Sequence, residues 1–203
     1  IFTKINRKNM KLSLELTYKT PQAWIDCVMQ NFNEFLQDHA DCERKASAMA
    51  MSFVAKCPEK TEIIPELIET ALEEMEHFRD VYKLMESRGV QLKHEIEQDL
   101  YIKGLINVCR SGRDERLMDR MLIASIVECR GAERFRMIEE ALNEPTLKKF
   151  YKTLWTSEAK HGNIFVKMAL NYWPENVVMK RLQELNELEG EICSSLKIRP
   201  RLH

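Results

Sequence analysis

The sequence lacks several features that identify whole classes of protein. Its six cysteines form no Cys-x-x-Cys pair, which argues against a zinc ribbon or a rubredoxin-like iron site. No apolar run approaches the roughly 18 residues of a membrane span, and no secretory pattern opens the chain. We therefore expect a cytoplasmic protein without a membrane partner, whose scattered cysteines are buried and reduced.

Glycine, proline and net charge are also low. Only six Gly and six Pro occur among 203 residues, of which 31% are charged and 44% hydrophobic, a composition typical of long helices. The net charge of −1 gives no overall positive field that would indicate a nucleic-acid partner, although a local basic face would be enough to bind one. The length favours one domain with a sizeable core.

The hydrophobic periodicity predicts an all-α protein. Four long segments carry an inward stripe with the 3.6-residue period, and most of them end at Pro or Gly. The long connection between the second and third segments contains a shorter helix, a crossover typical of ferritin-like four-helix bundles, and an extra C-terminal helix follows the fourth segment. The expected helices cover residues 20–57, 61–88, 98–110, 114–142, 145–172 and 175–196.

The same reading divides the chain into three parts. Residues 1–19 are expected to be an extended N-terminal arm, 20–196 the ferritin-like bundle, and 197–203 a basic, loose C-terminal tail. Thr20 should cap the first helix, with Pro21 at its first position.

Two Glu-x-x-His pairs stand at matching places in the two halves of the chain, each preceded by a lone Glu one helix earlier. The lone Glu precedes its pair by 31 residues in the first half and 30 in the second, and the pairs are 84 residues apart. Glu and His at i, i+3 share one helix face. One such pair is a weak signal, but the duplicated spacing indicates a site. The six residues are Glu43, Glu74, His77, Glu128, Glu158 and His161.

All six residues fall on the apolar stripes of their helices. A buried carboxylate is costly unless it is paired or bound to metal, and four converging carboxylates would repel one another. Two divalent cations would balance their four negative charges, and this ligand set is typical of a bundle that holds two metal ions. The alternative is a set of exposed helical Glu and His that only look periodic.

Mixed carboxylate and imidazole ligands favour iron, or manganese, over metals that prefer thiolates. Two iron(II) ions could together supply two electrons to dioxygen, and the resulting oxidant could attack an unactivated C–H bond. The protein would orient the substrate and provide a pocket that fits it. We assign Glu43 and His77 to the first ion, Glu128 and His161 to the second, and Glu74 and Glu158 to bridging positions.

Three further residues are candidates for orienting the ligands. Glu73 and Ser157 directly precede the two bridging candidates, so each could hydrogen-bond a group across the site, although a solvent-facing Glu73 fits the pattern equally well. His39 lies one turn before Glu43 on the same face. We expect His39 to be a hydrogen-bonded core or pocket histidine rather than a ligand.

Four segments surround these residues: Asp-His-Ala-Asp-Cys-Glu-Arg-Lys-Ala (38–46), Glu-Glu-Met-Glu-His-Phe (73–78), Val-Glu-Cys-Arg-Gly-Ala-Glu-Arg-Phe (127–135) and Ser-Glu-Ala-Lys-His (157–161). Together they resemble the MiaE family of bacterial tRNA 2-methylthio-N6-isopentenyladenosine hydroxylases. The third and fourth segments go beyond a generic di-iron pattern. The resemblance covers about residues 20–175.

This resemblance implies a ferritin-like, non-haem di-iron monooxygenase. Such an enzyme hydroxylates the isopentenyl group of the modified adenosine at position 37, in the anticodon loop of tRNA. It uses dioxygen as co-substrate and two electrons from a reductase partner. The six residues found from spacing match the ligands of the family.

RNA binding has only weak support from the sequence itself. An anticodon loop needs a basic surface and aromatic side chains on which bases can stack. Three basic groups are candidates, each with an ordinary solvated helix face as its alternative, and none is singled out as a tRNA-binding site. They are Lys148, Lys149 and Lys152; Arg110, Arg113, Arg116 and Arg120; and Lys197, Arg199 and Arg201.

Other functions are compatible with the same six Glu and His residues. A ferritin-type iron-storage or ferroxidase protein would need the same ligands but would assemble into a hollow shell. A di-iron hydroxylase of another substrate, a manganese catalase and a metal-free helical scaffold are further alternatives.

Overall fold

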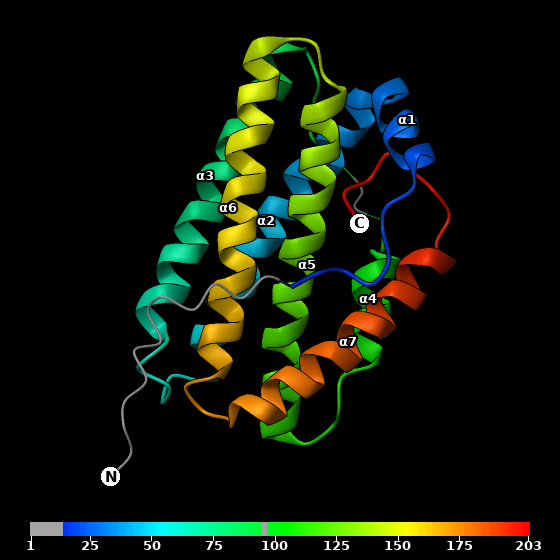
Figure 1. The fold of residues 1–203 in the computed structure, drawn as a ribbon. Helices are drawn as coiled ribbons and strands as arrows, with labels where there is room; N and C mark the ends of the chain where they lie inside the picture. Colours follow the sequence, from blue (N-terminus) through cyan, green and yellow to red (C-terminus); the bar gives the residue numbers. More distant parts are fainter. Residues whose placement is uncertain (1–13, 95–96) are drawn as a thin grey trace.

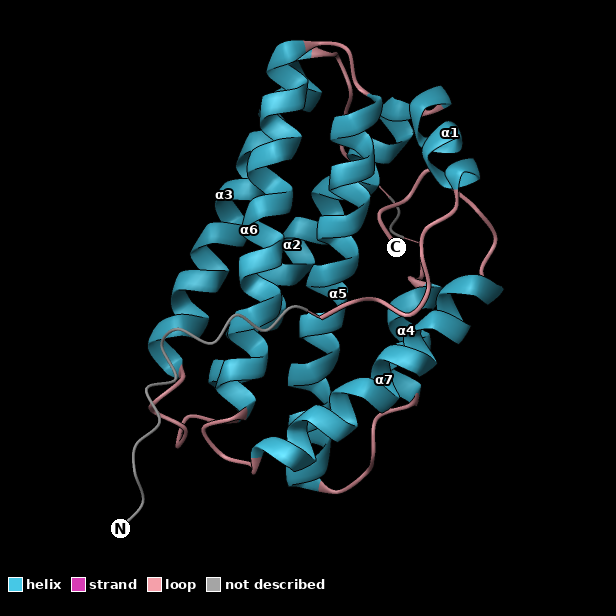
Figure 2. Cartoon of the chain, viewed as in Figure 1, coloured by secondary structure: helices cyan, strands magenta, loops and turns pink. Residues whose placement is uncertain are grey.

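The computed structural model describes residues 14–94 and 97–203, and this part of the chain contains seven helices and no strand (Figure 2). Four long helices lie side by side as a bundle, with three shorter ones against it (Figure 1). The predicted all-α bundle with a long crossover and an extra C-terminal helix is confirmed. The helices are α1 Gln22–Gln30, α2 Phe32–Lys56, α3 Ile64–Ser87, α4 Leu100–Asn107, α5 Arg113–Ala141, α6 Pro145–Ala169 and α7 Glu175–Ser195.

The bundle consists of two closely packed helix pairs, α2 with α3 and α5 with α6. The crossover between the pairs contains α4, which packs with α7 along one side of α5 (Figure 1). Leu105, Leu122 and Leu185 are fully buried in one apolar cluster, so α4, α5 and α7 share a core. None of the helices in the described residues is long and apolar enough to cross a membrane.

The first predicted helix is wrong in one respect, because the chain breaks at Asn31 into α1 and α2. The Asn31 side chain donates a hydrogen bond to the Cys27 carbonyl, and Asn competes in this way with helical hydrogen bonding. The turn lets α1 bury Trp24 and Val28 against the end of the bundle. Thr20 does not cap α1, since its hydroxyl donates to Glu133 instead.

The other helix limits differ from the prediction by only a few residues. Gly89 follows α3 with φ +66°, a left-handed conformation in which glycine carries no steric penalty. Pro145 opens α6 as its first residue, and the Glu144 carboxylate before it accepts the N–H groups of Thr146 and Leu147. These stops and starts are local features of the sequence.

The expectation of a loose tail at residues 197–203 is wrong. Leu202 is only 4% exposed, and its N–H donates to Asp38 at 2.8 Å. The Arg134 guanidinium donates to the Leu202 carbonyl, and the Trp24 indole donates to the Arg201 carbonyl at 2.9 Å. The tail therefore binds in a groove between α1, α2 and α5.

The N-terminal arm is tied to the bundle where it is described, while residues 1–13 lie outside the described range. Leu16 is buried, and the Asn186 side chain on α7 bonds the backbone on either side of it, at Glu15 and Thr17. All six cysteines are free. Only Cys57 and Cys193 are buried, so the expectation that all six are buried is wrong.

Candidate metal centre

The six Glu and His residues meet inside the bundle, between α2, α3, α5 and α6. Their ligand atoms form two groups in which all atoms lie within 4.8 Å of one another. His77 is the most exposed of the six, with 14% of its side chain accessible to solvent, whereas the other five are buried. One group contains Glu43, Glu74, His77 and Glu158, and the other contains Glu74, Glu128, Glu158 and His161.

Both histidines present the same nitrogen to the carboxylates. His77 Nδ1 lies 3.5 Å from a Glu43 oxygen and 3.3 Å from a Glu158 oxygen, and His161 Nδ1 lies 2.6 Å from Glu74 Oε1. The helix periodicity explains this convergence, because each His follows its Glu by three residues and shares its face.

Burial and mutual repulsion dominate the electrostatics of the cluster. Burial, together with the charge of Glu128, raises the pKa of Glu74 to about 7. Burial and the charge of Glu74 likewise raise the pKa of Glu158 to about 7. Burial and the nearby Glu158 raise the pKa of Glu128 well above its ordinary value. Without a cation, this cluster therefore resists the full ionisation of its carboxylates.

The donor atoms fit a divalent cation. Glu74 Oε1 and His161 Nδ1 are close but lack hydrogen-bond geometry, and both are buried without a hydrogen-bond partner, as are His77 Nδ1 and one Glu158 oxygen. Buried polar atoms normally have a partner. Carboxylate oxygens and imidazole nitrogens that converge in this way are the arrangement that a metal ion stabilises, and this mixed set of donors suits iron or manganese.

Glu73 reaches across from α3 to α6 beside the cluster. It lies 2.8 Å from His161 Nε2 and accepts a hydrogen bond of 2.7 Å from Lys160. Burial would raise the pKa of Glu73, but the bonds from Lys160 and His161 lower it below its ordinary value. An ionised Glu73 accepts the Nε2 proton of His161, so Nδ1, which faces the carboxylates, is the nitrogen that can bind a metal ion.

The other two candidates for orienting the ligands differ in position. His39 is fully buried outside the two groups, with its Nε2 2.7 Å from a Glu43 oxygen. Burial alone would raise the pKa of Glu43, but its hydrogen bond with His39 and the nearby His77 ring hold that pKa below the ordinary value. Ser157 is half-buried and, among the described residues, makes no hydrogen bond with any of the six. Sequence reasoning missed Lys160, although it lies within the Ser-Glu-Ala-Lys-His segment.

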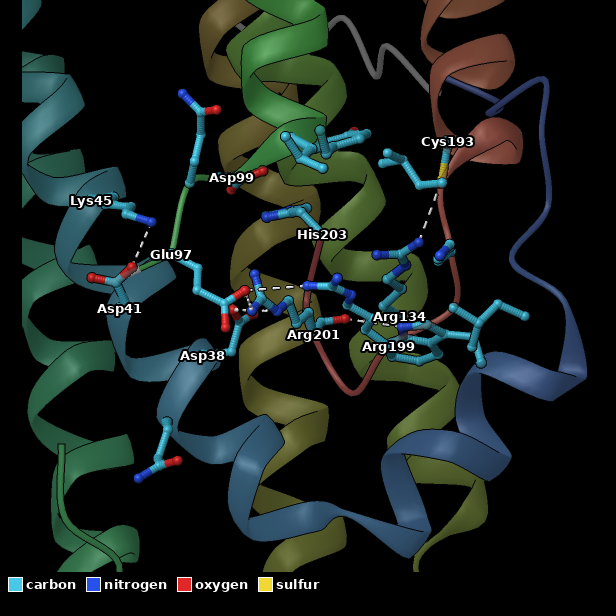
Figure 3. Close-up of a pocket in the computed structure, with 18 of the residues that line it drawn as sticks. Asp38, Asp41, Lys45, Glu97, Asp99, Arg134, Cys193, Arg199, Arg201 and His203 are labelled. Carbon is cyan, nitrogen blue, oxygen red and sulfur yellow. Dashed lines mark hydrogen bonds and ion pairs between the residues drawn. The ribbon is translucent and has the colours of Figure 1, made fainter. Parts of the chain in front are cut away.

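A separate cavity of about 490 Å³ lies on the other side of α2 and is lined by none of the six residues. Figure 3 shows Arg199 and Arg201 directed toward Glu97 across its mouth, with His203 further in. Arg134 from α5 lies at the inner end, where it donates to Cys193. The tail thus forms one wall of this cavity, away from the metal centre.

The buried cluster has two groups of donors that could each hold a cation and that share Glu74 and Glu158. The family model described as tRNA-(MS2IO6A)-hydroxylase (MiaE) matches residues 9–203. The chain belongs to the MiaE family.

This MiaE chain is similar to two curated relatives that share a name, tRNA 2-(methylsulfanyl)-N(6)-isopentenyladenosine(37) hydroxylase. The protein from Pseudomonas putida is 32% identical over 184 residues, which cover 91% of this chain and 89% of the relative. The protein from Salmonella typhimurium is 24% identical over 225 residues, covering 87% of this chain and 82% of the relative.

The MiaE chain is also similar to a solved structure, Protein 43 with aldehyde deformylating oxygenase activity from Synechococcus. The two share 29% sequence identity and a TM-score of 0.87, with 93% of this chain and 94% of the other covered. The likeness extends over the whole bundle and agrees with the predicted ferritin-like fold.

Proposed function

We propose that this chain is an oxygen-dependent di-iron hydroxylase that acts on the isopentenyl group of 2-methylthio-N6-isopentenyladenosine at position 37 of tRNA. Membership of the MiaE family gives the class, a tRNA hydroxylase. The observation that carries the proposal is the buried cluster of four carboxylates and two imidazoles. Its ligand atoms form two groups, and two of the carboxylates belong to both. Family membership favours hydroxylation over iron storage.

Each iron would have two ligands of its own and two that it shares. Glu74 and Glu158 belong to both groups and would bridge the ions. The remaining ligands would be Glu43 and His77 for one ion, and Glu128 and His161 for the other.

Two iron ions held here would supply the redox chemistry that activates dioxygen. The surrounding protein orients the ligands and excludes water. Glu73 fixes the ring of His161, and His39 fixes one oxygen of Glu43. Burial keeps bulk water from the oxidising centre. In the overall reaction a C–H bond, dioxygen, two electrons and two protons give a C–OH group and water, so a reductase partner must deliver the two electrons.

The proposal is tested by mass spectrometry of tRNA nucleosides from cells with and without this protein. The isopentenylated adenosine should gain one oxygen atom only when the wild-type chain is present. Glu74→Ala removes a shared carboxylate and should abolish this gain and lower the metal content, because each ion loses a ligand. Glu76→Ala, an exposed change on the same helix, is the control and should behave as wild type.

Metal analysis of the purified protein should give about two iron atoms per chain. Unchanged nucleosides in the presence of an iron-loaded wild-type protein and a working reductase would overturn the proposed substrate. A high-mass hollow assembly without hydroxylation would favour storage instead.

A further inference from the structure

The outward face of α6 is basic along its whole length. The helix contains five lysines, at positions 148, 149, 152, 160 and 167, and Glu158 is its single acidic residue. Because Glu158 belongs to the metal centre, no carboxylate of α6 faces solvent. The helix therefore combines metal-binding side chains on its inner face with positive charge on its outer face.

The lysines form a stripe rather than a scattered set. Lys149, Lys152, Lys160 and Lys167 recur at intervals of whole helical turns, which places them on one side of the helix. Lys149, Lys152 and Lys160 are exposed and Lys167 is half-buried. The stripe extends from Lys149 to Lys167, a separation of 18 positions, or about 27 Å at the α-helical rise, so several phosphates of a nucleic-acid backbone can lie along it.

Three of these lysines are available to a partner. Within residues 14–94 and 97–203, no carboxylate comes within ion-pair distance of Lys149, Lys152 or Lys167. Lys160 alone in the stripe is paired, with Glu73. Lys148 lies off the stripe and donates to the carbonyls of Glu139 and Leu142 at the end of α5.

The other two basic groups of the sequence are more strongly engaged inside the molecule. Arg110 binds Asp119 and Glu115, and Arg113 pairs with Glu59, whereas Arg116 and Arg120 make no ion pair with the described residues. Arg199 and Arg201 both bind Glu97, which leaves only Lys197 of the tail group unpaired among the described residues. Charges neutralised in this way contribute less to binding a polyanion than unpaired lysines.

The stripe also lies next to the solvent-facing edge of the metal centre. His77, the most exposed of the six residues, has its Nδ1 3.3 Å from Glu158 on α6 and so lies between α3 and α6. We call this boundary between α3 and α6 the seam. Lys160 on α6 also lies at the seam, because it contacts Glu73 on α3. A polyanion that binds along α6 would therefore place some of its attached groups close to the solvent-facing edge of the metal centre.

The α3 side of this seam carries no comparable positive charge. Glu69, Glu76 and Asp80 are exposed on α3, but Glu76 pairs with Arg79 and Asp80 pairs with Lys83. Because these pairs largely cancel, a polyanion is attracted to α6 rather than to α3, and this asymmetry gives it a preferred position beside the seam.

We propose that the outward face of α6 is the docking surface for the RNA backbone of the tRNA substrate, with Lys149, Lys152 and Lys167 contacting phosphates. The inference rests on the proposed function for the identity of the RNA. Phosphate contacts position a nucleic acid without reading its sequence. They would here bring the modified adenosine to the α3–α6 seam at His77, where its side chain can approach the metal centre.

The test compares two triple variants with the same change in charge. The first replaces the α6 stripe by Lys149→Ala, Lys152→Ala and Lys167→Ala. The second replaces three basic residues around the separate cavity by Lys93→Ala, Lys197→Ala and Arg199→Ala. Lys160 is left intact because it contacts Glu73. The binding of unmodified and modified tRNA to the iron-loaded proteins is measured by fluorescence anisotropy over a range of salt concentrations.

The α6 variant should bind tRNA at least about tenfold more weakly than wild type, and its slope of log K against log salt should be shallower by about three. Its iron content and thermal unfolding should match wild type, since Lys149 and Lys152 are exposed, Lys167 is only half-buried, and none of the three makes an ion pair with the described residues. The cavity variant should keep most of its affinity.

Equal affinity of the α6 variant and wild type, or a larger loss in the cavity variant, would overturn the docking surface while leaving the hydroxylase function in place. Failure of the wild-type protein to bind or hydroxylate tRNA would overturn both proposals together.

Discussion

Glu73 shows how one residue outside the ligand set can control the site. It is about one-third exposed, yet it contacts a histidine with no exposed surface. Its carboxylate fixes the proton of His161 on the nitrogen that faces away from the cluster. This is the arrangement by which carboxylates raise the basicity of metal-binding histidines.

Glu73→Gln should weaken iron binding by about 10- to 100-fold, because the neutral amide holds the His161 ring less firmly and no longer supports its basicity. Iron affinity measured by competition with a chelator gives the readout without relying on turnover. Glu69→Gln, an exposed change one turn earlier on α3, is the matched control. If Glu73→Gln binds iron as tightly as Glu69→Gln, the orienting role is wrong.

Among the helices, α7 is held to the bundle by a buried charge network that the sequence did not indicate. Glu189 on α7 is fully buried and accepts hydrogen bonds of 2.9 Å from Arg130 on α5 and from the Tyr101 hydroxyl on α4. Arg130 also donates to the Tyr18 carbonyl in the arm. One network thus connects the arm, α4, α5 and α7 behind the metal centre.

Glu189→Gln should destabilise the fold by about 3 kcal/mol, because it leaves Arg130 buried with less compensating charge. For a chain of this size, the expected fall in Tm is roughly 6–12 °C. Thermal unfolding followed by circular dichroism measures this, with Glu191→Gln, exposed on the same helix, expected within about 0.5 kcal/mol of wild type. Similar Tm values for both variants would show that the network contributes little.

For the molecule as a whole, the metal centre makes stability depend on pH and metal. Without metal, burial and neighbouring charge raise the pKa of Glu74 and of Glu158 from 4.5 to about 7. Burial alone would lower the pKa of His161, but the Glu74 carboxylate beside its Nδ1 and the other nearby carboxylates raise it from 6.5 to about 9. Between about pH 4.5 and 9, these three groups therefore bind more protons in the native apoprotein than in the unfolded chain.

The stability of the apoprotein should consequently fall as pH rises from 6 to 8, by on the order of 1–2 kcal/mol. Iron displaces these protons, so iron binding should strengthen over the same range and the loaded protein should lose less stability or none. Urea unfolding at both pH values, with and without iron, measures the difference. An apoprotein that becomes more stable toward pH 8 would contradict this account of the cluster.

The metal centre could be predicted from the sequence because its signals are local. A Glu and a His three residues apart share a helix face in any helix, and two such pairs with matching lone glutamates needed only the bundle to bring them together. Gly89 and Pro145 marked helix ends for equally local reasons. The role of the six residues as ligands stays a prediction, for which the structure supplies the geometry.

Other features depend on partners far away in the chain, and no local pattern contains them. The break at Asn31 lets α1 bury Trp24 and Val28 against side chains from distant helices at the end of the bundle. Leu202 is anchored by Asp38, 164 residues earlier, and Arg130 by Glu189, 59 residues later. Contacts of this kind form only when distant segments of the chain meet in the fold. Local sequence spacing was therefore enough to identify the candidate metal-binding residues, whereas the tertiary structure decided which side chains surround and support them.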